Sequence, residues 1–120
     1  MKIIKSFVFA FNGIKICFFS ETNFKIHLLV AVIAVLFGIG FKISGTEWLA
    51  IIFCISLVVA MEMINTAIEK LCNVVHKDFS MCIKNVKDIA AGAVLVTALF
   101  TLLTGIIIFL PKIITCIKAI

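Results

Sequence analysis

The sequence predicts an all-α membrane protein with three transmembrane helices and one amphipathic helix on the membrane surface at the N-terminus. Three observations support this prediction: 64% of the 120 residues are hydrophobic, 14% are charged, and the mean hydropathy is +1.32. Soluble domains are far more polar. Because each span needs about 20 residues, the length allows a single membrane-embedded domain, residues 1–120, with no separate soluble catalytic domain.

The surface helix is expected over residues 2–19, where polar residues follow one stripe. Lys2, Lys5, Asn12 and Lys15 recur at helical spacing, and apolar side chains occupy the other faces. This pattern is typical of a helix lying in the membrane surface. A cleaved secretory signal is the alternative, but polar residues interrupt its apolar stretch and no A-x-A site follows.

Three apolar runs follow, and they predict spans over about residues 26–42, 48–72 and 88–110. A polar break precedes the first span, and Ser20 is expected to cap the helix after it. A turn at residues 44–46 precedes the second, whose helix is expected to begin at Glu47 and continue to about Val75. Pro111 marks the end of the third span.

The placement of the lysines predicts the orientation in the membrane. Most of them lie around the N-terminus or between the second and third spans, at positions 2, 5, 15, 25, 70, 77, 84 and 87. The positive-inside rule therefore places the N-terminus and the second connection in the cytoplasm. No concentrated basic stripe or aromatic platform suits nucleic acid. The five cysteines show no zinc-binding spacing, so we assign them neither a metal nor a disulfide.

Glu62, Asn65 and Glu69 interrupt the second apolar run. At 100° per residue, the two glutamates lie within about 20° of each other and Asn65 about 60° to one side, so all three share one helix face. Ionisable groups at membrane depth are costly, and they usually face a protein interior or a polar cavity where function resides. The alternative is a polar seam of interhelical hydrogen bonds.

Glu21 and Glu69 come from different segments but are expected at similar depth near the cytoplasmic surface. Two carboxylates, phosphate oxygens and water form a suitable set of ligands for Mg²⁺. Lys87 and Asp88 precede the small-residue run AAGA, where a lysine and a helix start can neutralise phosphate charge. Solvated helix ends and simple helix packing are the alternatives for these residues. No P-loop, GxGxxG or HRD/DFG set occurs, so the usual soluble kinases are excluded.

The segments ETNFKIHL at 21–28, EMINTAIE at 62–69 and KDIAAGAV at 87–94 resemble the small bacterial membrane diacylglycerol kinases, a family that includes the undecaprenol kinases. The resemblance extends from about Lys5 to Leu110 without gaps. It implies a homotrimer in the bacterial cytoplasmic membrane, with active sites shared between subunits. The implied reaction is ATP- and Mg²⁺-dependent phosphorylation of a lipid alcohol, either diacylglycerol or undecaprenol.

The resemblance also implies roles for individual residues. Glu62 matches the catalytic base, and Glu21 and Glu69 match the metal ligands that hold Mg²⁺ with ATP. The residues implied to contact the nucleotide, besides those two glutamates, are Lys2, Asp78, Phe79, Ser80, Lys87 and Asp88. Those implied for the lipid site, besides Glu62, are Asn23, Lys25, Trp48 and Ala91, and Asn65 is expected to hold either Glu62 or the lipid headgroup.

Some positions depart from the family pattern. Lys2 stands where some members have Arg near the nucleotide, and Lys25 stands where Arg is frequent. The point charge of a lysine is not equivalent to the bidentate fork of an arginine. Asn73 stands where Asp is frequent, and Phe9 where some members have a ring with a hydroxyl. His27, where other members carry an acid, makes the chain more similar to the undecaprenol kinase branch. The alternative function is a non-catalytic pore or assembly subunit, against which Glu21 and the Lys-Asp pair argue.

Overall fold

The computed structural model describes residues 1–75, 78 and 80–120, and in this part of the chain it is all-α. The four helices are α1 (Lys2–Ser20), α2 (Thr22–Phe41), α3 (Gly45–Val75) and α4 (Met81–Lys118). Each is long and apolar enough to cross a membrane. The all-α prediction is confirmed, and the predicted spans fall within α2, α3 and α4 except for Lys42, which caps α2.

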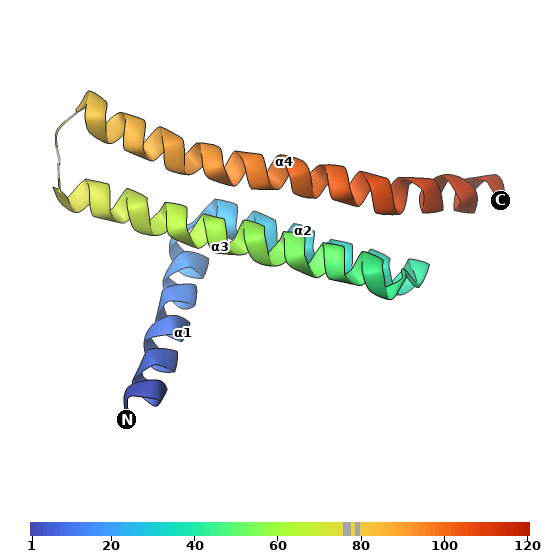
Figure 1. The fold of residues 1–120 in the computed structure, drawn as a ribbon, viewed down its shortest axis with the longest axis horizontal. Helices are drawn as coiled ribbons and strands as arrows, with labels where there is room; N and C mark the ends of the chain where they lie inside the picture. Colours follow the sequence, from blue (N-terminus) through green and yellow to red (C-terminus); the bar gives the residue numbers. More distant parts are fainter. Residues whose placement is uncertain (76–77, 79) are drawn as a thin grey trace.

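α2, α3 and α4 run side by side along the long axis, whereas α1 leaves them at a steep angle (Figure 1). The most extensive helix contact joins α3 and α4, and α2 packs mainly on α3. With 38 residues, α4 is about 57 Å long, close to the 58 Å length of the whole chain. It continues through Pro111, whose carbonyl accepts a hydrogen bond from Thr115 Oγ1 at 2.9 Å.

The expected cap at Ser20 is wrong. Ser20 is the last residue of α1, where its Oγ donates to the carbonyl of Ile16 at 2.6 Å. The single residue Glu21 then separates α1 from α2 in extended conformation and occupies the N-cap of α2. The hydroxyl of Ser20 satisfies a carbonyl of its own last turn instead of an amide of the next helix.

The turn between α2 and α3 is closed by local hydrogen bonds. Lys42 adopts a left-handed conformation, with φ 52° and ψ 54°, and the amides of Lys42 and Ile43 donate to the carbonyls of Ile39 and Gly38. This is the Schellman pattern at a helix end. Ser44 and Glu47 then form a reciprocal capping box, since each backbone amide donates to the other side chain at 3.0 and 3.2 Å. α3 therefore begins at Gly45, close to the predicted start.

The main buried cluster lies at this end of the bundle and is formed by Ile43, Ile51, Ile108 and Phe109, with Trp48 packed against it. A Cβ at Gly38 would lie 2.7 Å from Trp48 Cη2, so only glycine permits this approach of α2 to α3. Lys112 Nζ pairs with Glu47 Oε2 at 3.2 Å and ties α4 to the same corner. The apolar corner fixes the register of the three long helices, while the polar residues gather further along α3.

Candidate functional site

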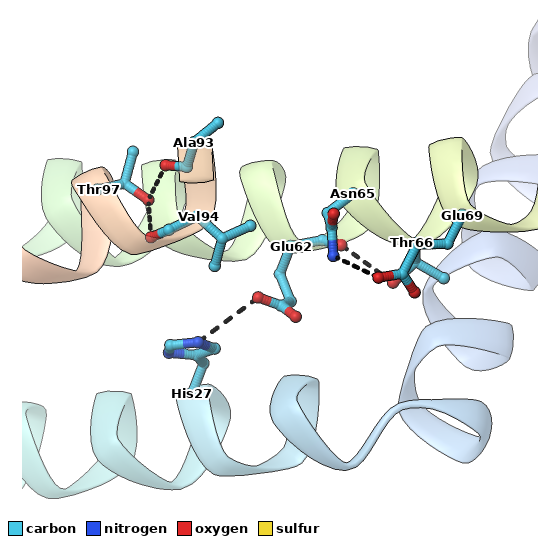
Figure 2. A network of polar contacts seen from close by, with 8 residues as sticks. All are labelled: His27, Glu62, Asn65, Thr66, Glu69, Ala93, Val94 and Thr97. Carbon is cyan, nitrogen blue, oxygen red and sulfur yellow. Dashed lines mark hydrogen bonds and ion pairs between the residues drawn. The ribbon is translucent and has the colours of Figure 1, made fainter. Parts of the chain in front are cut away.

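Glu62 lies on α3 with only 2% of its surface exposed. Its Oε2 atom is 3.5 Å from Nε2 of His27, which projects from α2 (Figure 2). This distance falls within ion-pair range, but Oε2 receives no hydrogen bond from any residue that the structure describes. A buried carboxylate oxygen without a donor is costly and requires a structural or functional reason.

Asn65 and Glu69 form a second polar contact one turn along α3. Asn65 Nδ2 donates to Glu69 Oε1 at 3.3 Å (Figure 2). Asn65 therefore bonds to Glu69, whereas the sequence led us to expect Glu62 or the lipid headgroup as its partner. Its Oδ1 is buried and has no hydrogen-bond donor within the described residues. Thr66, 2% exposed, completes this buried face by donating to the Glu62 carbonyl at 3.0 Å.

Glu21 is the N-cap residue of α2 and lies about 9 Å along that helix from His27, which contacts Glu62 of α3. No group of three or more Cys, His, Asp or Glu residues in the described ranges could hold a metal ion by itself. Mg²⁺ at a nucleotide does not require such a group, since one or two carboxylates and phosphate oxygens suffice. The hard oxygens of Glu21 and Glu69 fit this cation chemically, as does Oδ1 of Asn65, which accepts no hydrogen bond from the residues that the structure describes.

Lys87 and Asp88, the expected nucleotide contacts, lie in the first turns of α4. Lys87 Nζ donates to Asn73 Oδ1 of α3 at 2.7 Å. Asp88 pairs with Lys84 at 2.6 Å on an exposed surface. Because Asn73 is neutral, it orients Lys87 without cancelling its charge. The ammonium group therefore remains available to an anion.

The remaining expected site residues lie at several places in the chain. Asn23 and Lys25 are exposed on the first turn of α2, and Lys25 Nζ lies 5.5 Å from the centre of the Phe18 ring. Ala91 is exposed on α4. Asp78 is exposed, Ser80 is the N-cap residue of α4, and Phe79 lies outside the described residues.

Two of the expected residues lie far from Glu62 within one protomer. Trp48 packs in the apolar corner, fourteen residues from Glu62 and thus about 21 Å along α3. Lys2 is exposed at the free end of α1, about 27 Å along that helix from Ser20. The protomer therefore gathers the three glutamates, Asn65 and His27, but not the whole expected site.

An apolar cavity of about 540 Å³ lies between α2, α3 and α4 and reaches His27. Its walls are almost entirely aliphatic and aromatic, and include Val30, Ala34, Phe37, Val58, Leu102 and Phe109. The imidazole of His27 therefore lies between this cavity and the buried carboxylate of Glu62. Helix periodicity places residues on a face but does not reveal the opposing side chain, so the sequence did not place His27 beside Glu62, or Asn73 beside Lys87.

Comparison with known proteins adds independent information. The family model described as prokaryotic diacylglycerol kinase matches residues 8–109. The chain belongs to the prokaryotic diacylglycerol kinase family. It is 36% identical over 111 residues to the undecaprenol kinase of Bacillus subtilis, covering 92% of this chain and 90% of that protein. The resemblance found in the three motifs is thereby confirmed.

Two other members of the family are named diacylglycerol kinases. The Synechocystis protein is 32% identical to this chain, and the match covers 94% of this chain and 65% of that protein. A Helicobacter pylori protein is 27% identical, and the match covers 87% of this chain and 82% of that protein. Membership makes the chain a lipid kinase that uses ATP, with a membrane lipid as acceptor. The prediction of an enzyme is confirmed.

Proposed function

We propose that the chain phosphorylates a membrane lipid alcohol with Mg²⁺-ATP and that Glu62 is the general base. The observation that carries this proposal is the buried Oε2 of Glu62, which lacks a hydrogen-bond donor among the described residues. A lipid hydroxyl would supply that donor. As the hydroxyl oxygen attacks the γ-phosphorus of ATP, its proton would move to Glu62 and ADP would leave.

Charge stabilisation is the second requirement, because phosphoryl transfer offers the protein little covalent chemistry. We assign Mg²⁺ to Glu21 and Glu69, and when bound it would neutralise charge on the phosphates. Lys87 would contact the phosphates from α4, and its bond to Asn73 holds the ammonium near α3. We keep Asp88, Lys2, Asp78, Phe79 and Ser80 as nucleotide contacts, and Asn23, Lys25, Trp48, Asn65 and Ala91 as contacts of the lipid.

Undecaprenol is the substrate that we favour over diacylglycerol. The support is the 36% identity to a protein named undecaprenol kinase and the presence of His27 in the motif NFKIHL. Apolar walls discriminate long chains poorly, since one methylene is worth about 1 to 3 kcal/mol even in a formed pocket. Both lipids should therefore be phosphorylated in vitro, with undecaprenol preferred.

We further propose that α1 lies in the cytoplasmic surface of the membrane and that the active protein is a homotrimer. The lysine stripe of α1 and its steep angle to the other helices support the surface position (Figure 1). The positions of Trp48 and Lys2, far from Glu62 in one protomer, support sites completed by neighbouring subunits.

A radiolabelled ATP assay tests the proposal. The purified chain in mixed micelles is given undecaprenol or diacylglycerol, and kcat/KM is measured for each lipid. We expect turnover of both and a higher value for undecaprenol. A diacylglycerol value at least tenfold higher would reverse the substrate preference. No turnover of any lipid alcohol would favour the non-catalytic pore or assembly subunit.

A further inference from the structure

Nε2 of His27 and Oε2 of Glu62 lie close enough together for one hydroxyl group to bridge them from the side. Nε2 of His27 and Oε2 of Glu62 are 3.5 Å apart, close to each other but not hydrogen-bonded (Figure 2). One hydroxyl oxygen can lie about 2.8 Å from both atoms at once, since hydrogen bonds of this length are ordinary. The hydroxyl would then accept from His27 and donate to Glu62.

The surroundings make a lipid alcohol the suitable occupant. The Glu62 side chain is 3% exposed, so bulk water cannot satisfy Oε2, whereas the His27 side chain is 25% exposed. His27 also lines the apolar cavity between the three long helices. An apolar chain in that cavity would reach His27, whose imidazole contacts Glu62.

We propose that His27 binds the hydroxyl oxygen of the lipid substrate and shares this hydroxyl with Glu62. The inference rests on the proposed function. The hydroxyl oxygen accepts a hydrogen bond from the N–H of His27 with one lone pair. Its other lone pair remains free to attack the γ-phosphorus. As the new O–P bond forms, the proton moves to Glu62 Oε2 and the bond from phosphorus to ADP breaks. The His27 N–H then stabilises the charge that develops on the attacking oxygen.

The test uses a polyprenol and its methyl ether. The ether oxygen can accept a hydrogen bond from His27 but has no proton to give to Glu62. The inhibition constant of the ether therefore reports the contact with His27 alone. Loss of one hydrogen bond should raise that constant about threefold to tenfold in His27→Leu and lower kcat/KM for the alcohol similarly. KM for ATP should not change. His27→Gln, which keeps an N–H donor, should recover part of the loss.

Thr104→Val is the matched control, because Thr104 lies on α4 outside the cavity and its hydroxyl bonds the carbonyl of Phe100. It should leave the ether constant unchanged. An unchanged ether constant in active His27→Leu overturns the inference, since His27 would then act only by holding Glu62. If the parent protein phosphorylates no lipid alcohol, the proposed function itself fails.

A spectroscopic measurement covers the case in which His27→Leu does not assemble. The chain has two histidines, and His27→Gln identifies the His27 signals in the imidazole ¹⁵N spectrum. Adding the ether to the parent protein should shift the Nε2 signal of His27. Absence of this shift at ether concentrations that inhibit the enzyme overturns the inference.

Discussion

Glu62 and Glu69 lie two turns apart on α3, yet their carboxylates have different surroundings. Glu69 accepts a hydrogen bond from Asn65, whereas Glu62 faces His27, which lines the apolar cavity, and no residue in the described part of the chain donates to Oε2 of Glu62. A bonded, partly exposed carboxylate suits cation binding, and a buried carboxylate with a free acceptor suits proton transfer. The different environments thus support different roles for two identical side chains.

Glu62→Gln should abolish phosphoryl transfer while leaving ATP binding intact. The amide keeps the shape of the side chain but cannot accept the hydroxyl proton, and loss of a general base costs about 10²- to 10⁴-fold in rate. Single-turnover kinetics and nucleotide binding measure the two effects. Glu47→Gln is the control, because Glu47 pairs with Lys112 at the far end of α3. Near-parental turnover in Glu62→Gln would remove this residue from the mechanism.

Glu21→Gln and Glu69→Gln should each weaken Mg²⁺-dependent nucleotide binding, because each change deletes one anionic oxygen ligand. Excess Mg²⁺ should partly restore activity in both variants, but not in Glu62→Gln. Titration of activity with Mg²⁺ at fixed ATP gives the measurement. If both variants require the same Mg²⁺ concentration as the parent, the metal assignment is wrong.

At the scale of the elements, long apolar runs made the helices predictable but not all of their ends. The start of α3 was predictable, because Ser44 and Glu47 cap it through hydrogen bonds between residues three positions apart. The cap of α2 was predicted one residue too early, because the single extended residue Glu21 is enough to separate α1 from α2.

The candidate site was predictable to a similar extent. Periodicity within α3 grouped Glu62, Asn65 and Glu69, but the contacts of His27 and Asn73 depend on how separate helices pack. Helix packing is determined by the apolar corner around Ile51 and Phe109, which lies far from these polar side chains in the sequence. No local sequence pattern encodes the packing of separate helices.

Lys42→Gly should stabilise the turn between α2 and α3. Lys42 has φ 52°, a conformation that costs a residue with a side chain about 1 kcal/mol but costs glycine little. Part of that gain is lost to the greater freedom of glycine in the unfolded chain, so we expect about 0.5 kcal/mol of net stabilisation. The midpoint of unfolding in detergent measures it. Lys118→Gly, at the helical end of α4, is the control and should not stabilise; an equal gain there would contradict this explanation.

At the scale of the whole molecule, the chain exposes more surface than a compact monomer. Its accessible area is 8813 Å² for 13.2 kDa, against about 6,400 Å² for a soluble protein of this mass. Large apolar side chains account for much of the difference, for example Phe53, Ile89 and Phe100 at 68, 74 and 65% exposure. Lipid or other protomers must cover these faces.

Mixing two inactive variants tests whether neighbouring protomers share sites. Glu62→Gln lacks the proposed base on α3, and Asp88→Asn lacks the exposed carboxylate on α4. If one site takes these residues from adjacent subunits, some mixed trimers contain a site with both residues intact. For random mixing in equal amounts, cyclic symmetry predicts recovery of roughly a quarter of parental activity. Each variant reconstituted alone should remain inactive, and cross-linking in mild detergent should show trimers. Mixtures that stay inactive despite verified mixed trimers would show that each chain carries its own complete site, and an active monomer would contradict the trimer altogether.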